Sequence, residues 1–474
     1  MFRSENYIGG QWIKTKDQID VYNPADGKVI GTVPKAGKKE AKQAVDAAAE
    51  AFAEWSTKTA VERSELLRSW HQLIQSNTDE LARIMTIEQG KPLKEATGEI
   101  KYGNDFIAWY AEEGKRIYGE TIPGSSPSQR IMVTKQPVGV VAAITPWNFP
   151  SSMITRKIAP ALAAGCTVVI KPSGETPFSA IKLVELAEKA GIPAGVINIV
   201  TGSSSDIADV WQEDSRVRKL SFTGSTEVGK QLMAGAAATM KKISLELGGH
   251  APFIVTKHAD LDDAAAGLIS SKFRNGGQTC VCANRIYVHE SVADEFAEKF
   301  TKLAKELKVG NGLEEGTDIG PLINQEAVDK VVRHIKDATD KGGVLLAGGR
   351  ALPDLGGHYV EPTVIMHATD EMECMQEETF GPLAPITTFK TLDEAIERAN
   401  NSPYGLAAYV YTELLGEAVK LSEVLDYGII GINDPVPSTA QAPFGGFKES
   451  GLGREGGHYG IDEFLEVKYI SLSL

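Results

Sequence analysis

Two cysteines, Cys280 and Cys282, lie in the segment Gly276–Arg285, which reads GGQTCVCANR. A thiol among glycines and other small residues can be approached by a substrate carbonyl, and its thiolate form is a strong nucleophile. A free cysteine is also often a small, buried packing residue. The segment alone leaves both interpretations open, so the other polar segments of the chain must decide between them.

Asn148 and Glu246 each lie at the end of a predicted buried strand. Asn148 belongs to Thr145–Pro150 (TPWNFP), where two prolines predict a stiff turn that holds the amide in one direction. A rigid amide donor suits an oxyanion site, although Asn and Pro also favour plain turns. Glu246 stands beside Gly248–Gly249. Burial raises the pKa of such a carboxyl and suits a general base. An ion-paired structural glutamate is the alternative.

Three further kinds of segment have the composition of a ligand-binding edge. Lys171 closes an apolar strand and could bind ribose hydroxyls or phosphate, although a solvated lysine is the commoner case. Gly224–Gly229 (GSTEVG) opens a predicted helix, whose N–H groups can bind a pyrophosphate. Thr226 replaces the second glycine of the full dinucleotide fingerprint. The loops Glu377–Pro382 and Pro443–Lys448 combine glycine with aromatic residues, which favours tight turns.

The elements around these residues follow a clear pattern. After a short irregular start, apolar residues at helical spacing predict helices over Lys38–Trp55, Val61–Gln89 and Leu93–Ile117. From Val138 to Leu245, short β-branched runs alternate with helical segments. This alternation predicts a parallel sheet covered by helices, with its ligand at the carboxyl ends of the strands.

Strand and helix patterns resume beyond residue 250. The series from Ala251 to Asn433 predicts a second α/β domain. The tail Phe464–Leu474 alternates as a half-exposed strand does. Such a strand usually pairs with another, and a second subunit is one candidate partner.

Composition excludes several classes of protein. A chain of 474 residues has room for two or three domains. A net charge of −14 argues against nucleic-acid and anionic-membrane partners, while leaving room for a local basic pocket. Four cysteines are too few for a disulfide framework. No apolar run reaches the roughly 20 residues that span a bilayer, and the start resembles no signal peptide, so we expect a cytoplasmic protein.

Two other cysteine chemistries fit poorly. A papain-like hydrolase needs a histidine base, and none of the eight histidines lies in a recognisable motif. A zinc site needs a second pair of ligands besides Cys280 and Cys282, and no such pair stands at ligand spacing, so we expect no metal.

Taken in order, the motifs resemble those of the aldehyde dehydrogenase superfamily across nearly the whole chain. The matching segments are TPWNFP, KPS at Lys171, FTGSTEVG, LELGG, GQTC, EETFGP and PFGG. Within that superfamily the runs KFRN, CVCANR and GLGREG resemble those of succinate-semialdehyde dehydrogenases.

The resemblance implies a covalent mechanism. Cys280 would attack the aldehyde to give a thiohemiacetal, whose oxyanion Asn148 and the Cys280 backbone N–H would hold. Hydride loss would leave a thioester, and Glu246 would activate the water that hydrolyses it. Because Glu246 is present, a phosphorylating or coenzyme-A-acylating relative is disfavoured. A catalytically silent scaffold is the alternative outside enzymology, and the three residues together argue against it.

The resemblance also implies a fold with three parts. Residues 1–121 and 142–248 would form a Rossmann-like, parallel-sheet dinucleotide-binding domain, and residues 249–445 an α/β catalytic domain. Residues 122–141 and 446–474 would form a small β element for oligomerisation into a homodimer or homotetramer.

The cofactor implied is NADP or NAD. Relatives that prefer NAD often carry a glutamate at the position of Gly174. The glycine removes the repulsion that a glutamate would exert on the 2′-phosphate of NADP. The adjacent Glu175 could still favour NAD. The residues expected to bind the cofactor are Ile144, Thr145, Trp147, Lys171, Ser173, Gly174, Glu175, Gly224, Ser225, Val228, Glu378 and Phe380.

The implied substrate is succinate semialdehyde. Its distal carboxylate needs a cation, and Arg156 and Arg274 stand where the semialdehyde branch places such a clamp; guanidinium binds carboxylate bidentately. Ser438 is a third expected contact. Structural salt bridges are the alternative for both arginines. Because the segment Asp434–Gln441 differs from the loop commonly seen, broader activity on glutarate semialdehyde or on uncharged or aromatic aldehydes stays open.

Cys282 has two interpretations. A disulfide to Cys280 would block the nucleophile reversibly, provided that the chain bends to bring the two Cα atoms within about 7 Å. A small packing residue is the alternative.

Overall fold

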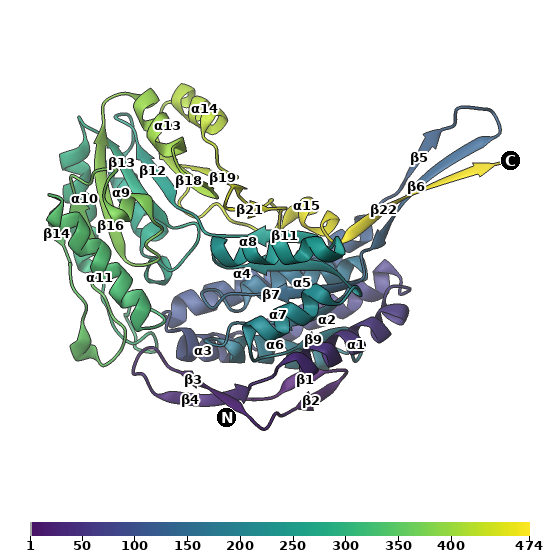
Figure 1. Ribbon diagram of the computed structural model, residues 1–474. Helices are drawn as coiled ribbons and strands as arrows, with labels where there is room; N and C mark the ends of the chain where they lie inside the picture. Colours follow the sequence, from purple (N-terminus) through teal and green to yellow (C-terminus); the bar gives the residue numbers. More distant parts are fainter. Residues whose placement is uncertain (1) are drawn as a thin grey trace.

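The computed structural model describes residues 2–474 and contains two large sheets covered by helices (Figure 1). The first sheet has the order β2-β1-β9-β8-β7-β10-β11-β21. Its central strands β9 to β11 are parallel, and β1, β2 and β21 are antiparallel to their neighbours. The strands are β1 (Asn6–Ile8), β2 (Gln11–Ile13), β7 (Val140–Ile144), β8 (Thr167–Lys171), β9 (Ile197–Ile199), β10 (Val217–Thr223), β11 (Lys242–Glu246) and β21 (Gly451–Leu452).

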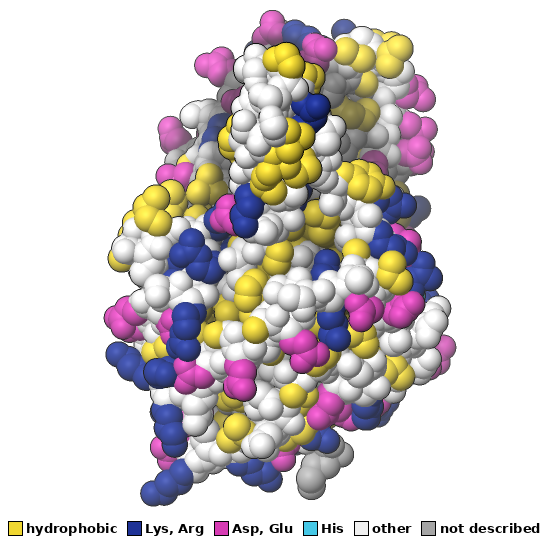
Figure 2. Space-filling view, turned by 90° about the vertical axis from the view of Figure 1, so that its right-hand side faces the viewer, with side chains coloured by type: hydrophobic (Ala, Val, Ile, Leu, Met, Phe, Trp, Pro, Cys, Tyr) yellow, Lys and Arg dark blue, Asp and Glu magenta, His cyan; other side chains and the backbone are white. Residues whose placement is uncertain are grey.

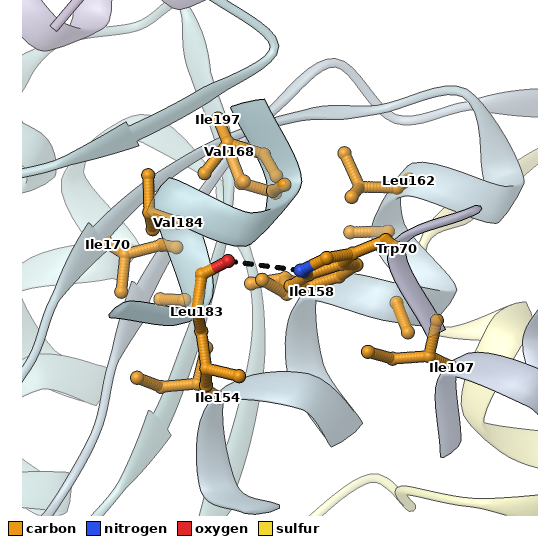
Figure 3. Close-up of a cluster of buried hydrophobic side chains, with 14 of the residues drawn as sticks. Trp70, Ile107, Ile154, Ile158, Leu162, Val168, Ile170, Leu183, Val184 and Ile197 are labelled. Atoms are coloured by element: carbon orange, nitrogen blue, oxygen red, sulfur yellow. Dashed lines mark hydrogen bonds between the residues drawn. The ribbon is translucent and has the colours of Figure 1, made fainter. Parts of the chain in front are cut away.

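Alternate residues of the buried strands pack on opposite faces of this sheet, as the two-residue repeat of a strand requires. Val141 and Ala143 join one core with helices α2 to α6, whereas Val140 and Ala142 join another with α1, α7 and α8. In the first core, Trp70 donates from Nε1 to the Leu183 carbonyl at 3.0 Å (Figure 3). The helices are α1 (Lys38–Trp55), α2 (Ala60–Ser76), α3 (Thr78–Gln89), α4 (Leu93–Glu113), α5 (Ser152–Ala164), α6 (Pro177–Lys189), α7 (Ser204–Glu213) and α8 (Thr226–Ala236).

The second sheet has the order β14-β15-β16-β13-β12-β18-β19, and all its strands but β14 are parallel. Phe253 and Ile254 pack on opposite faces. The strands are β12 (Ala251–Val255), β13 (Ala283–His289), β14 (Val344–Ala347), β15 (Thr363–Met366), β16 (Leu383–Phe389), β18 (Ala407–Tyr411) and β19 (Ile429–Ile432). The helices are α9 (Leu261–Lys272), α10 (Ala293–Glu306), α11 (Gln325–Asp340), α12 (Glu373–Gln376), α13 (Leu392–Asn400) and α14 (Leu415–Val424).

Three strands form an arm that projects from the body and ends near the C-terminus (Figure 1). They are β5 (Glu120–Pro123), β6 (Gln129–Pro137) and β22 (Leu465–Ser473), in the order β22-β6-β5. The expected terminal strand is therefore present, and its partner is β6 of the same chain along all nine residues. Figure 2 looks toward the arm, whose exposed side chains include Ile122, Val467, Tyr469 and Leu472.

Two expectations were wrong in detail. The helix expected over Val61–Gln89 is two helices, because Asn77 leaves helical geometry and its side chain donates to the Leu73 carbonyl at 2.7 Å. The start of the chain is regular: β1 and β2 form one hairpin, and β3 (Gln18–Tyr22) and β4 (Val29–Pro34) form another. The strands β1 and β2, of three residues each, are too short to show a repeat. Within residues 2–474, no helix has the length and apolar character needed to cross a membrane.

Candidate active site

Cys280 lies in the loop between α9 and β13. The chain leaves helical geometry at Asn275 and Gly276, both with positive φ, before it reaches the thiol. Gly249, which follows β11, lies against the Cys280 backbone, since a Cβ there would be only 2.4 Å from the Cys280 carbonyl oxygen. The glycines after β11 therefore allow the first sheet to approach the cysteine loop.

The Cys280 side chain stands between two cavities. The first, of about 310 Å³, is lined by Lys91, Glu95, Gly98, Glu99, Tyr102, Phe149, Ser152, Met153, Arg156, Arg274, Thr279, Cys280, Val281, Val436, Ser438 and Phe444. The second, of about 260 Å³, is lined by Pro146, Trp147, Asn148, Met153, Thr223, Gly224, Ser225, Leu247, Gly248, Cys280, Lys330, Glu378 and Phe380. A molecule in either cavity can thus reach the same thiol.

Asn148 is held by the cysteine loop. Its Nδ2 donates to the Gln278 carbonyl at 3.0 Å, and its own carbonyl accepts from Asn275 Nδ2 at 3.0 Å. Asn148 is buried and lines the second cavity together with Cys280. One Nδ2–H is bound, and an amide has two. The other is the donor that an oxyanion could use.

Glu246, the last residue of β11, is buried, and neither of its carboxyl oxygens has a hydrogen-bond partner within residues 2–474. Burial, with the Glu455 carboxylate adding to it, raises the Glu246 pKa well above the ordinary value, although Arg156 and Lys157 act in the opposite direction. A carboxyl without a fixed partner can accept a proton from water, which is the behaviour expected of a general base.

Arg156 is committed to a buried ion cluster. Its Nε lies 2.5 Å from Glu455 Oε2, and Lys157 Nζ lies 2.5 Å from the other oxygen of the same carboxylate. The Arg156 guanidinium also lies 3.9 Å from the centre of the Phe444 ring. Arg156 lines the first cavity, and its Nε and Nη2 are both buried without a hydrogen-bond partner among the described residues, so its contact with Glu455 is an ion pair.

Arg274 differs from Arg156. It makes no ion pair or side-chain hydrogen bond with any described residue, and its guanidinium lies 5.6 Å from the centre of the Phe149 ring. It lines the first cavity with Ser438 and Cys280. Its whole donor set is therefore available to an anion in that cavity.

Five of the residues expected to bind the cofactor line the second cavity, namely Trp147, Gly224, Ser225, Glu378 and Phe380. Ser225 caps α8, accepting from Val228 N. Glu378 accepts from Gly249 N at 3.2 Å, and burial raises its pKa to about 7. Phe380 has φ 56, a strained conformation of the kind that clusters at functional sites. It meets Trp147 edge to face at 5.6 Å.

The other seven lie outside that lining, on strands β7 and β8, the segments that follow them and helix α8. They are Ile144, Thr145, Lys171, Ser173, Gly174, Glu175 and Val228. Ile144 and Lys171 are register partners. The Lys171 ammonium is buried, and its single acceptor among the described residues is the Pro172 carbonyl at 3.3 Å; burial lowers its pKa to about 8. A buried ammonium with one weak partner, an N-capped helix and an aromatic-lined cavity are together suited to a dinucleotide.

The two cysteines differ in position. Burial raises the pKa of Cys280 to about 12, with Glu378 contributing, so the thiol needs a neighbouring positive charge to ionise. Cys282 is fully buried, and its Sγ donates to the Lys272 carbonyl at 3.2 Å. In this structure Cys282 packs as a core residue and lines neither cavity.

Sequence reasoning missed the contribution of α4 and α11. Glu95, Glu99 and Tyr102 are spaced four and three residues apart, which places them on one face of α4 toward the first cavity. That spacing of two carboxylates and an aromatic residue was a usable signal. Lys330 of α11 lines the second cavity and donates to the Glu378 carbonyl at 2.5 Å, a contact that no local pattern indicates. Within residues 2–474 no cluster of His, Cys, Asp or Glu is arranged to hold a metal.

Comparison with known proteins places these features in one family. The model of the aldehyde dehydrogenase family matches residues 12–470. The chain is 53% identical to the NADP-dependent succinate-semialdehyde dehydrogenase of Escherichia coli, over 100% of this chain and 98% of that protein. It is 55% identical to a glutarate-semialdehyde dehydrogenase of Pseudomonas putida, with the same coverage. The structure of succinate-semialdehyde dehydrogenase from Burkholderia pseudomallei matches with a TM-score of 0.99 at 51% identity, over 100% of this chain and 98% of that one. The predicted α/β fold class and family resemblance are confirmed.

Proposed function

The chain belongs to the aldehyde dehydrogenase family, and from this premise we propose that it oxidises succinate semialdehyde to succinate with NADP. The observation that carries the proposal is the position of Cys280 between two cavities. One contains Arg274, which has no ion-pair partner within residues 2–474, and the other is suited to a dinucleotide. Relatives named for succinate and glutarate semialdehydes support it, since both aldehydes carry a distal carboxylate. Glutarate semialdehyde is the second candidate substrate.

The chemistry divides among three residues of the chain. The Cys280 thiolate attacks the aldehyde carbon, and the oxygen of the resulting thiohemiacetal takes the negative charge. Asn148 Nδ2 and the Cys280 backbone N–H are the donors for that oxygen. NADP, when bound, supplies the acceptor for the hydride that leaves this carbon, so a thioester remains on Cys280. Glu246 then takes a proton from water as the water attacks the thioester, which releases the carboxylic acid and restores the Cys280 thiolate.

The first cavity fits an aldehyde with a distal carboxylate. Arg274, whose guanidinium has no ion-pair partner among the residues that the structure describes, lines this cavity together with Ser438 and Cys280. Arg156 is already ion-paired with Glu455, although its Nε and Nη2 have no hydrogen-bond partner among the described residues. We assign Arg274 as the principal carboxylate ligand, with Arg156 and Ser438 as supporting contacts. A bidentate guanidinium–carboxylate pair orients as well as binds the substrate.

Residues at and beyond the strand ends support NADP use. Trp147, Ser225, Glu378 and Phe380 would hold the nicotinamide half, and Lys171 would bind the adenosine half. A Cβ at Gly174 would meet no atom within 4 Å, so the backbone there leaves space for a 2′-phosphate. The relative from Escherichia coli named for NADP supports the same choice. NAD is the alternative, favoured by Glu175.

The test of the function is absorbance at the reduced-nicotinamide band with succinate semialdehyde, glutarate semialdehyde and butanal, each with NADP and NAD. We expect the highest kcat/KM with succinate semialdehyde and NADP. If kcat/KM for butanal equals that for succinate semialdehyde, the enzyme does not recognise the distal carboxylate. Higher kcat/KM for glutarate semialdehyde would move the assignment to that substrate.

The arm formed by β5, β6 and β22 is the proposed oligomerisation element. Apolar side chains on β5 and β22 are exposed, Tyr469 by 59% and Val467 by 69%, which favours their burial against a second copy. A homodimer or homotetramer in multi-angle light scattering would support this, and a monomer at micromolar concentration would contradict it. We propose the cytoplasm as the compartment, where a catalytic thiol stays reduced.

A regulatory disulfide between Cys280 and Cys282 stays a proposal. It requires Cys282 to leave its contact with the Lys272 carbonyl, which is a rearrangement of a buried side chain. Mild peroxide should then inactivate the enzyme, and added thiol should restore its activity. The Cys282→Ala variant should resist inactivation by peroxide. Equal sensitivity of both proteins would assign Cys282 to packing alone.

A further inference from the structure

A buried ion pair lies behind the two loops that carry Asn148 and Cys280. Lys91 and Glu99 are 2% and 4% exposed, and Lys91 Nζ lies 2.5 Å from Glu99 Oε2. Desolvating two charges is costly, so a buried pair is weak evidence for stability in itself. The other contacts of the pair indicate what geometry it fixes.

Lys91 holds the residue that the proposed mechanism places at the oxyanion. Its Nζ donates to the Asn148 carbonyl at 2.7 Å and lies 4.0 Å from the centre of the Phe149 ring. An ammonium has three N–H donors. Two are bound to Glu99 and Asn148, and the ammonium faces an aromatic ring. Although Lys91 lines the first cavity, it is therefore arranged to hold the protein and not a substrate carboxylate.

Glu99 holds the same turn a few residues further on. Its Oε1 accepts from the backbone N–H groups of Ser151 and Ser152, at 2.9 and 3.1 Å. These amides begin α5, whose N-cap Ser151 makes no capping hydrogen bond of its own. A carboxylate at a helix start also interacts favourably with the helix dipole. The pair thus fixes both ends of the segment Asn148–Ser152.

The same helix also contacts the cysteine loop. Glu95, one turn before Glu99 on α4, accepts from Asn275 N at 2.8 Å. Asn275 Nδ2 is the second donor to the Asn148 carbonyl, and Asn148 Nδ2 donates to Gln278, two residues before Cys280. One helix, with Lys91 before it, therefore sets the position of the Asn148 amide relative to the thiol.

We propose that Lys91 and Glu99 form a positioning pair for the oxyanion site. The pair acts through Asn148, keeping its peptide fixed so that the free Nδ2–H stays directed at the reacting carbon's oxygen. This inference rests on the proposed function. Because a misplacement of about 1 Å can cost about 100-fold in rate, the pair can matter without touching the substrate.

The test is a double-mutant cycle between the pair and Asn148. The variant Lys91→Met/Glu99→Gln replaces both charges by neutral side chains of similar length, so that no buried charge is left alone. We expect it to lower kcat with succinate semialdehyde by about tenfold or more, with KM changed by less than about twofold. In the Asn148→Ala background the same change should cost less than about twofold, because groups that act through one another are not additive.

Two readouts distinguish positioning from general support of the fold. The alkylation rate of Cys280 by iodoacetamide does not require Asn148 and should stay unchanged, as should NADPH binding measured by fluorescence. Equal losses of kcat in the two backgrounds, or a fall in alkylation that matches the fall in kcat, would overturn the proposal. If the double variant does not fold, Lys91→Arg, which keeps a cation beside Glu99 but changes the donor to the Asn148 carbonyl, enters the same cycle.

The wild-type enzyme separates this inference from the function on which it rests. A wild type without turnover on any of the aldehydes would contradict the proposed function. An active wild type with additive losses would contradict only the positioning role of Lys91 and Glu99.

Discussion

Arg156 Nε lies 2.5 Å from Glu455 Oε2, in a buried cluster completed by Lys157 on the same carboxylate. Arg274, which lines the same cavity as Arg156 and Cys280, has no ion-pair partner among the described residues. The two arginines line one cavity but differ in what their guanidinium groups can still bind. From this difference we expect Arg156 to maintain the structure of the site and Arg274 to select the substrate.

The free arginine should control substrate selection. Arg274→Ala should lower kcat/KM for succinate semialdehyde by about 10- to 100-fold, because a bidentate, charge-assisted pair is lost. Butanal, which has no carboxylate, is the matched control and should change by less than about threefold. Steady-state kinetics with both aldehydes checks this. An equal fall for both substrates would show that Arg274 supports the site without recognising the carboxylate.

The paired arginine should control stability. Arg156→Met leaves Glu455 buried with only Lys157 as its cation, and breaking a buried pair costs about 3–5 kcal/mol. We expect a clear drop in Tm, whereas Arg274→Met, the matched control on the same cavity, should leave Tm nearly unchanged. Differential scanning calorimetry measures both. A larger drop in Tm for Arg274→Met would reverse the two roles.

Gly174 should set the preference between the two cofactors. A Cβ there meets open space, so Gly174→Glu can be accommodated, and its carboxylate would repel a 2′-phosphate and accept from a ribose hydroxyl. The ratio of kcat/KM for NADP over NAD should fall by about tenfold or more. Gly174→Gln, of the same size but neutral, should change the ratio far less. If both variants shift it equally, the effect is steric and the charge argument is wrong.

Hydrolysis of the acyl enzyme should depend on pH through Glu246. A base works when deprotonated, and burial raises the Glu246 pKa, so hydrolysis should slow as pH falls through a value well above the ordinary glutamate pKa of about 4.3. Stopped-flow measurement of the slow phase after a single turnover gives this rate. Glu378 is a second carboxyl whose pKa is raised, to about 7. The same measurement in Glu378→Gln is therefore the control. An inflection near the ordinary value would remove Glu246 from the role of base.

Much of this arrangement was predictable from local patterns. The helix α1 has the expected bounds, Lys38–Trp55, because its apolar repeat is uninterrupted. Glu246 ends the strand β11, and Asn148 lies in the turn that follows the apolar strand β7, so both could be proposed from the sequence pattern. Neighbouring parallel strands end at the same edge of a sheet, so such residues converge.

The rest depends on contacts between distant parts of the chain. Which arginine is paired could not be read from local patterns, because Glu455 lies 298 residues beyond Lys157 in the sequence. The hydrogen bond from Lys91 to the Asn148 carbonyl joins residues 57 positions apart in the sequence. Its acceptor is a backbone oxygen, which every residue type has, so the residue type gives no signal of the contact. Side-chain patterns report which face of an element is buried, but not which backbone atom it meets.

The most direct test of the central claim is mass spectrometry of the covalent intermediate in Glu246→Gln. Mixed with succinate semialdehyde and NADP, this variant should produce about one NADPH per active site and then stall, because its thioester cannot be hydrolysed efficiently. After acid quench, the peptide containing Cys280 should carry one succinyl group, on Cys280 and not on Cys282. Steady turnover without an adduct, or a succinyl group on another residue, would contradict the account.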